Sequence, residues 1–393
     1  MNLPLKQNNV NKETGSKLSF FMKMDIRAYA MIFALVAIWL FFAILTDGAF
    51  LSERNLSNLF RQMSVTAILA IGVVLVIVSG QIDLSVGSVA GLTGGVAAVL
   101  NVWVGLDPFL SIAVAIGLGI LIGIWQGFWV AYMSVPSFIV TLGGMLIFRG
   151  ILLGITKGNT IAPLSEGFRT IGQSYLSVSL GWILAAMAIV AVILFTLNKR
   201  RSRIKYGFEV APYSIELLKV AGISMLIILF VGTMNAYAGI PMPIMLVLVL
   251  GLIFTFIAKN TSFGRQIYAI GGNPEAARLS GINIRRRVMA VFILSGFMAS
   301  VAGVVLTARL NAATSSAGQM LELDAIAAAV IGGTSLMGGT GTIIGAVIGA
   351  LIMASLDNGM SMMNVEAFWQ YIVKGLILIL AVWVDVTTKK RRG

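Results

Sequence analysis

The sequence predicts an all-α membrane protein, a polytopic bundle of about 10–12 transmembrane helices, some of them short or broken. Two observations carry this prediction. Of the 393 residues, 58% are hydrophobic and only 11% are charged, whereas a soluble domain carries about a quarter charged residues. Apolar runs long enough to cross about 30 Å of hydrocarbon also recur along the chain. A soluble protein with a large core would need far more polar surface.

The candidate spans are the apolar segments between charged or glycine-rich breaks. Three junctions on the expected cytoplasmic side, 80–85, 132–137 and 338–341, contain no Lys or Arg. These junctions are either cytoplasmic loops, giving twelve spans, or turns at membrane depth packed in protein, giving ten. The twelve segments are 28–45, 63–79, 86–104, 109–131, 138–155, 180–197, 217–234, 244–258, 288–308, 325–337, 342–356 and 368–384.

The net charge is +13, and most of the Lys and Arg residues lie in four clusters: before residue 28, at 199–205, at 259–287 and at 389–392. Counted from a cytoplasmic N-terminus, all four clusters fall on the cytoplasmic side, as the positive-inside pattern requires. We therefore expect a multi-pass membrane protein with both termini cytoplasmic. It would have a tail over 1–27, a transmembrane domain over 28–386 and a basic tail over 387–393. We expect lipid contact and no nucleic acid.

Two glycine-rich breaks echo each other about 250 residues apart, at 79–88 and 331–339, and a small-residue helix follows each. Broken helices at corresponding places in two halves indicate a substrate pathway, although small residues also serve close helix packing. For Asp83 we favour a structural role, capping the helix that starts near Ser85. The polar groups that could line a pathway, or back-bond to their own helices, are Gln81, Asp83, Ser85, Ser88, Thr334 and Ser335.

Several charged residues lie within or beside the predicted spans, where an isolated charge costs several kcal/mol and is usually paired. Glu322 and Asp324 begin a helix, where their charge suits the dipole. Arg149 is a candidate partner for one of the acids. Proton coupling through such a carboxylate, as in a secondary transporter, is the alternative. Asp357 and Lys374 are two further charged residues within or beside the predicted spans.

The loop at 259–287 contains a short, well-capped helix between two spans. Asn273-Pro274 is a helix start, since the side chain caps and the ring presets the first turn. Glu275 suits the dipole of the first turn, and Gly281 can end the helix in a left-handed conformation. Such a rigid helix is either a simple linker or a docking element that carries force from another protein.

This loop also carries a resemblance to a known family. The string from Glu275 to Gly281 resembles the EAA loop through which importer permeases contact their ATPase, and the wider string resembles sugar permeases of the ribose and xylose type. Strings at 82–88, 322–336 and 369–375 resemble the same family, in the same order. The resemblance implies that the ATPase-coupling residues are Gly272, Asn273, Pro274, Glu275, Ala276, Ala277, Arg278 and Gly281.

The resemblance further implies a type II-like importer permease of the ATP-binding-cassette class that moves a monosaccharide across the bacterial inner membrane. Its partners would be a second permease copy, a cytoplasmic ATPase and a periplasmic sugar-binding protein. An inserted hairpin over about 180–235, absent from the shorter ribose type, resembles the xylose members, though residue chemistry does not separate xylose from ribose.

No enzymatic activity is expected of this chain. It has no phosphate loop, so ATP and Mg would be used by the partner ATPase. With no His or Cys, the sequence offers no imidazole base, thiol nucleophile or Cys/His metal site. We therefore expect no catalytic residue, no metal and no cofactor, and nothing favours an intramembrane enzyme.

Overall fold

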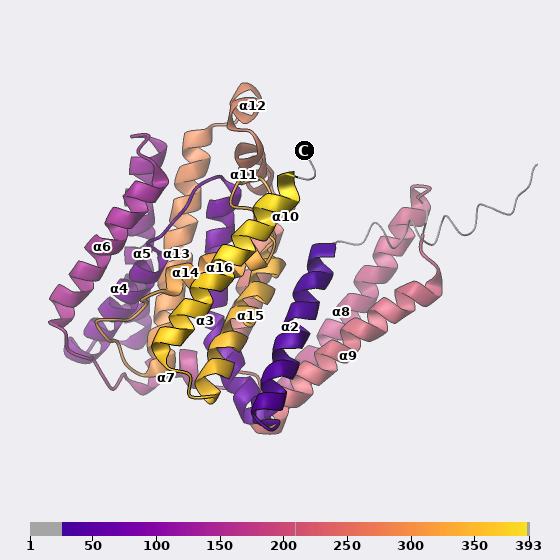
Figure 1. Cartoon of the computed structure of the whole chain (residues 1–393), viewed down its shortest axis with the longest axis horizontal. Helices are drawn as coiled ribbons and strands as arrows, with labels where there is room; N and C mark the ends of the chain where they lie inside the picture. The colour runs from indigo at the N-terminus through magenta and orange to yellow at the C-terminus, as the bar shows by residue number, and fades with distance from the viewer. Residues whose placement is uncertain (1–25, 209, 391–393) are drawn as a thin grey trace, which may run out of the picture.

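The computed structural model describes residues 26–208 and 210–390, and within these ranges every named element is a helix (Figure 1). This confirms the all-α prediction. Short 3-10 and π turns at Ala49–Leu51 and Val99–Trp103 supplement the α-helices. The α-helices are α2 (Ile26–Leu45), α3 (Glu53–Val78), α4 (Val86–Ala98), α5 (Pro108–Ala131), α6 (Ser137–Thr156), α7 (Glu166–Gln173), α8 (Val178–Lys205), α9 (Tyr213–Tyr237), α10 (Met242–Asn260), α11 (Ser262–Gly272), α12 (Pro274–Leu279), α13 (Ile284–Leu310), α14 (Leu321–Ile331), α15 (Ile343–Met362) and α16 (Ala367–Lys390).

Ten helices of the described part are long and apolar enough to cross a membrane: α3, α4 with its π continuation, α5, α6, α8, α9, α10, α13, α15 and α16. The chain is therefore a multi-pass membrane protein. Each of the twelve predicted spans contains a helix. Ten of these helices belong to this set, and the other two are α2 and α14. Most of the predicted N-terminal tail, and residues 391–393 of the C-terminal tail, lie outside the described residues.

The expected span at 325–337 is wrong in its bounds. The helix there, α14, begins at Leu321 and ends at Ile331, so its 11 residues rise only about 17 Å, half the hydrocarbon core. It ends where Gly333 takes a φ of +86°, a left-handed conformation that glycine adopts without steric cost. An irregular segment then leads to α15. The prediction failed because apolar residues continue past the glycines that stop the helix.

Helix α3 lies at the centre of the bundle, buried along nearly its whole length. It packs against α13, α15, α14 and α10. A helix that is apolar on all sides is stable only where other helices cover it, and α3 carries Val, Ile and Leu around its full circumference from residue 65 onward. The peripheral helices α8, α9 and α16 expose most of their apolar side chains, as lipid-facing helices do.

Two of the junctions without basic residues pack against each other. The backbone amide of Ile82 donates to the Ser137 hydroxyl (3.2 Å), and the Thr141 hydroxyl donates to the Ile82 carbonyl oxygen (3.3 Å). The third junction, at 338–341, packs against the end of α11. The first and third junctions are thus partly covered by protein, whereas residues 132–134 of the second are exposed, as in a surface loop.

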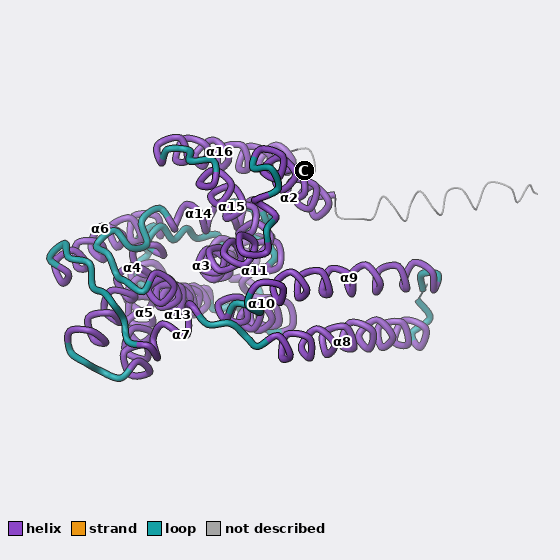
Figure 2. The backbone as a smooth tube through the Cα atoms, turned by 90° about the horizontal axis from the view of Figure 1, so that it is seen from below, coloured by secondary structure: helices purple, strands orange, loops and turns teal. Residues whose placement is uncertain are grey.

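The inserted hairpin consists of α8 and α9, which run side by side away from the rest of the bundle (Figure 2). Its observed bounds, 178–237, lie close to the expected 180–235. The hairpin joins the bundle mainly through the end of α9 nearest Met234, which is fully buried, and through α3. The basic tip of the hairpin lies at the same end of the molecule as α12 (Figure 1).

Helices α5 and α13 meet along a stripe of glycines. A Cβ on Gly119 would lie 2.5 Å from both the Gly296 carbonyl oxygen and the Ser300 Cβ, and a Cβ on Gly123 would lie 2.5 Å from the Phe292 carbonyl oxygen. The spacing of these glycines places them on one helix face. Small residues at such a seam let two membrane helices approach backbone to backbone.

We expect Gly119→Leu to lower the stability of the protein in detergent by about 1–3 kcal/mol or more, because the added side chain has no space in the seam. The measurement is the unfolding midpoint followed by circular dichroism. Gly117→Leu is the matched control, since a Cβ on Gly117 meets nothing within 4 Å. Equal midpoints for the two variants would contradict the close seam.

Candidate functional site

The short helix α12 has the caps that the sequence predicted. The Asn273 side-chain oxygen accepts from the Ala276 amide (3.0 Å), and Pro274 occupies the first turn. At the other end Gly281 has φ +79°, and the Ile282 amide donates to the Ala277 carbonyl oxygen (3.1 Å). This is the Schellman pattern that ends a helix in a left-handed residue. Six residues are thus fixed as a rigid unit outside the spans.

The surface of α12 is almost entirely free within the described structure. Of the eight expected coupling residues only Ala277 is buried. Glu275 and Arg278 form an exposed ion pair (2.7 Å) along the helix. Leu279 is 79% exposed, and sequence analysis did not single it out. An apolar side chain that exposed, on a helix projecting beyond the bundle (Figure 1), is suited to a pocket in another protein.

Helix α11 connects α12 to the interior, since it ends one residue before the Asn273 cap. Its Ile267 and Ile270 are buried. The Tyr268 hydroxyl donates to the Gly341 carbonyl oxygen (2.7 Å) in the turn between α14 and α15. Burial raises the pKa of the Tyr268 phenol, so it stays a neutral donor. This hydrogen bond connects α11, and through it α12, to the α14–α15 turn.

Both glycine-rich breaks meet at the last turn of α11. The Gly339 amide, from the α14–α15 turn, donates to the Val78 carbonyl oxygen at the end of α3 (2.9 Å). A Cβ on Gly271 would collide with that carbonyl oxygen and lie 2.6 Å from the Gly339 nitrogen. A Cβ on Gly272 would meet nothing within 4 Å. Gly271, Val78 and Gly339 form a three-way backbone contact, called here the glycine joint.

Asp83 is the centre of a buried hydrogen-bond network in the α3–α4 turn. Its Oδ1 accepts from the Ser85 amide (2.9 Å) and hydroxyl (2.6 Å), and its Oδ2 accepts from the Ser295 hydroxyl of α13 (2.8 Å). The Gln126 amide of α5 donates to the Ser85 hydroxyl (2.6 Å). Asp83 thus acts within the α3–α4 turn, on the Ser85 amide, and α4 has no side-chain cap at Ser85, so the capping role favoured from the sequence is not observed. Through Ser295 and Ser85 the network joins this turn to α13 and α5.

The other expected pathway residues are largely bonded within the protein. The Ser88 hydroxyl donates to the Ser85 carbonyl oxygen (2.8 Å), and the Ser335 hydroxyl donates to Asp385 (2.8 Å). The Thr334 hydroxyl is buried without a hydrogen-bond partner among the described residues. Gln81 is half-buried. These six residues fall into two groups, one at each glycine-rich break.

The intramembrane charges are paired, as their cost in a membrane requires. Lys374 of α16 lies between Asp324 of α14 (3.0 Å) and Asp357 of α15 (2.9 Å), beside a small cavity of about 70 Å³. Arg149 faces Glu322 at 3.7 Å. The sequence indicated that pairing was needed but not the partners, because each pair joins residues far apart along the chain.

Comparison with known families matches residues 55–382 to the model described as a branched-chain amino acid transport system permease component. That match spans most of the chain, including α12 and both glycine-rich breaks. The chain belongs to this family of membrane permeases. No solved structure matches it.

Among curated proteins the chain is 53% identical over 379 residues to the xylose transport system permease protein XylH of Escherichia coli K12, covering 96% of each chain. It is 51% identical to the XylH of Haemophilus influenzae Rd, over 94% of this chain and 98% of that one. The ribose import permease protein RbsC of the same H. influenzae strain is 35% identical, over 97% and 99%. The resemblance to sugar permeases of the ribose and xylose type is therefore confirmed.

We expect Asp83→Ala to destabilise the protein by about 1–3 kcal/mol, because the Ser85 amide and the Ser295 hydroxyl lose a buried acceptor. Denaturation in detergent measures the change. Ser88→Ala is the control, since the Ser85 carbonyl oxygen keeps its bond from the Val89 amide (2.8 Å). Unchanged stability together with lost transport would instead assign Asp83 to the substrate pathway.

Proposed function

We propose that this chain is the membrane-spanning permease subunit of an ATP-binding-cassette importer that moves D-xylose from the periplasm to the cytoplasm. The observation that carries the proposal is the identity to the xylose permeases, 51–53% over nearly the whole chain. The lower identity to the ribose permease, 35%, makes ribose the second sugar to test.

The proposal divides the work among several proteins. This chain has no phosphate loop, so a cytoplasmic ATPase would bind ATP and Mg and a periplasmic protein would deliver the sugar. A second copy of the permease would complete the translocation path. The exposed face of α12, with Leu279 at its end, supports an ATPase contact there.

The orientation follows from charge. The basic clusters at 199–205 and 259–287 and the C-terminal end of the chain lie at one end of the bundle, together with α12 (Figure 1). The positive-inside rule places that end in the cytoplasm, where an ATPase could reach α12. Both termini then face the cytoplasm.

In the mechanism that we propose, α12 and α11 act as a lever on the glycine joint. Movement of α12 by the ATPase is transmitted through the Tyr268–Gly341 hydrogen bond and through Gly271 to the ends of α3 and α14. Because the contact is backbone against backbone, little side-chain motion can absorb the displacement. The two breaks would move together and open or close the path between them.

The function is tested by reconstituting the protein in liposomes with a xylose-binding protein and the matching ATPase. Labelled D-xylose should accumulate only when ATP is supplied, and a proton uncoupler should leave the rate unchanged. Excess unlabelled xylose should compete, and ribose should compete less. Uptake that survives without the ATPase, or that collapses with the uncoupler, would contradict an ATP-driven importer.

The end of α12 provides a specific test of coupling. We expect Gly281→Val to abolish uptake while membrane insertion stays normal, because a β-branched residue at φ +79° costs about 1–2 kcal/mol and unwinds the cap. Gly281→Asn should retain most activity, since Asn tolerates the left-handed region. Normal uptake by the Val variant would exclude this cap from coupling.

The glycine joint provides a second test with a matched neighbour. We expect Gly271→Ala to lower uptake by about an order of magnitude, because the added methyl forces apart a close-packed contact. The ATPase should still bind, since α12 is unchanged. Gly272→Ala, whose Cβ enters open space, should transport far better than Gly271→Ala. Any loss in the Gly272 variant should come with weaker ATPase binding, because Gly272 is one of the expected ATPase-coupling residues. Equal uptake by the two variants would remove the joint from the proposed mechanism.

A further inference from the structure

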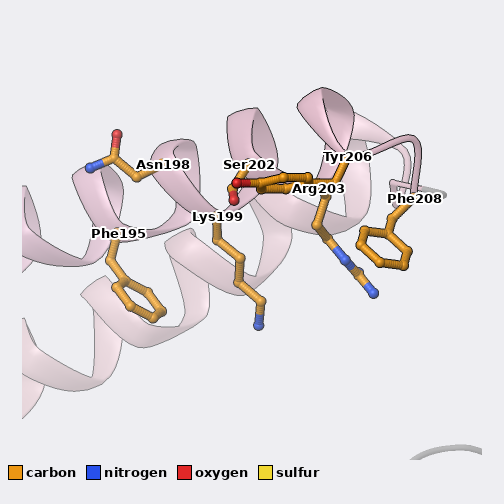
Figure 3. A pocket seen from close by; sticks show the side chains of 7 residues that line it. All are labelled: Phe195, Asn198, Lys199, Ser202, Arg203, Tyr206 and Phe208. Carbon is orange, nitrogen blue, oxygen red and sulfur yellow. The ribbon is translucent and has the colours of Figure 1, made fainter. Parts of the chain in front are cut away.

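The tip of the α8–α9 hairpin carries a basic hollow that neither the fold nor the proposed transport requires. The hollow is a shallow, open depression along the end of α8 and the turn that follows it. Its polar groups come from Asn198, Lys199, Ser202 and Arg203, and its apolar surface comes from Phe195, Tyr206 and Phe208. Figure 3 shows the Lys199 and Arg203 side chains extending to the same side of α8 as Phe195 and Phe208.

The length of α8 places this hollow at the depth of lipid headgroups. The helix has 28 residues, a rise of about 42 Å, against about 30 Å for the hydrocarbon core. Its first 20 residues, 178–197, are free of charge, and Lys199 is the first charged residue. The last two turns therefore lie in the headgroup region. Tyr206 fits this depth, because Tyr and Trp are enriched at the membrane–water interface.

The cations of the hollow are not neutralised within the described residues. Arg200 differs, because it pairs with Glu216 (2.7 Å), donates to the Ala211 carbonyl oxygen (2.8 Å) and stacks on Tyr213 at 3.6 Å. Arg200 thus holds the hairpin turn together. Lys199 and Arg203 are exposed and make no ion pair in the part of the chain that the structure describes. Glu209, in the same loop, lies outside the described residues.

We propose that this hollow binds the phosphate of an anionic phospholipid headgroup, of the phosphatidylglycerol class, in the cytoplasmic leaflet. Lys199 and Arg203, one turn apart on α8, contact the phosphate oxygens, and the Ser202 hydroxyl donates to the headgroup. Phe195 and Phe208 lie against the glycerol and the upper acyl chains. The hairpin is thereby anchored to the membrane at its free end.

A lipid fits this place better than a protein partner does. The hairpin tip and α12 lie at the same end of the molecule but are separated laterally, with the tip projecting to the right of the bundle in Figure 1. Figure 2 shows α8 and α9 extending together away from the other helices toward this tip. Juxtamembrane Lys and Arg clusters with interfacial aromatic residues are the pattern that anionic lipid surfaces attract.

The test is a lipid titration of the purified full-length protein in detergent, read by native mass spectrometry. Dioleoylphosphatidylglycerol and dioleoylphosphatidylcholine are added in separate series, with and without excess inorganic phosphate. The variant is Lys199→Gln/Arg203→Gln. The matched control is Arg201→Gln/Lys205→Gln, which removes the same charge at the same spacing from the same helix but from residues outside the hollow.

We expect the protein to bind phosphatidylglycerol more tightly than phosphatidylcholine. The Lys199/Arg203 variant should bind phosphatidylglycerol about 25-fold more weakly, since each cation near an anionic lipid contributes about fivefold. The control variant should change by less than about threefold, because its cations act only at a distance. Phosphatidylcholine binding should be the same in all three proteins, which excludes general damage.

Four results would overturn the proposal. Equal losses in the two variants would indicate diffuse attraction without a site. Equal affinity for the two lipids would remove the role of the negative charge. Displacement of the lipid by inorganic phosphate would assign the hollow to a soluble anion. The partner ATPase is also tested for co-purification with each variant. If the Lys199/Arg203 variant alone no longer binds the ATPase, the hollow is assigned to that protein partner.

Discussion

The hydrogen bond from the Gly339 amide to the Val78 carbonyl oxygen (2.9 Å) joins the two places where the bundle departs from regular helix. Irregular backbone at membrane depth is stable only where protein satisfies its polar groups, and here each break satisfies the other. The bond is possible because Gly271 has no side chain. This close contact brings together the end of α3, the turn after α14 and the end of α11, which leads directly to α12.

Much of the fold follows from local rules that the sequence displays. Apolar runs located a helix in every predicted span, and the Asn273-Pro274 start with Gly281 located α12 almost to the residue. These predictions succeeded because a cap or an apolar run is settled by neighbours within one or two turns. The end of α14 was missed because apolar residues continue past Gly332 and Gly333, and the sequence alone does not show that the helix stops at these glycines.

The candidate site was less predictable, because its interactions join distant parts of the chain. Asp83 bonds to Ser295, and Lys374 lies between Asp324 and Asp357. From the sequence alone each residue could only be judged in need of a partner. Gly271 gave no signal at all, since the adjacent Gly272 looks identical in the sequence. Only the three-dimensional arrangement separates the glycine that is enclosed from the one that is free.

The seam between α5 and α13 has a consequence for how such a protein can change shape. Where two helices touch through glycine backbones at Gly119 and Gly296, there are no rotamers to rearrange, and sliding would drive carbonyl oxygens into the facing chain. In the proposed mechanism this pair of helices would therefore move as one body. The break at 79–88 is hydrogen-bonded to the same pair through Ser295 and Gln126, so any rearrangement there would have to exchange those bonds.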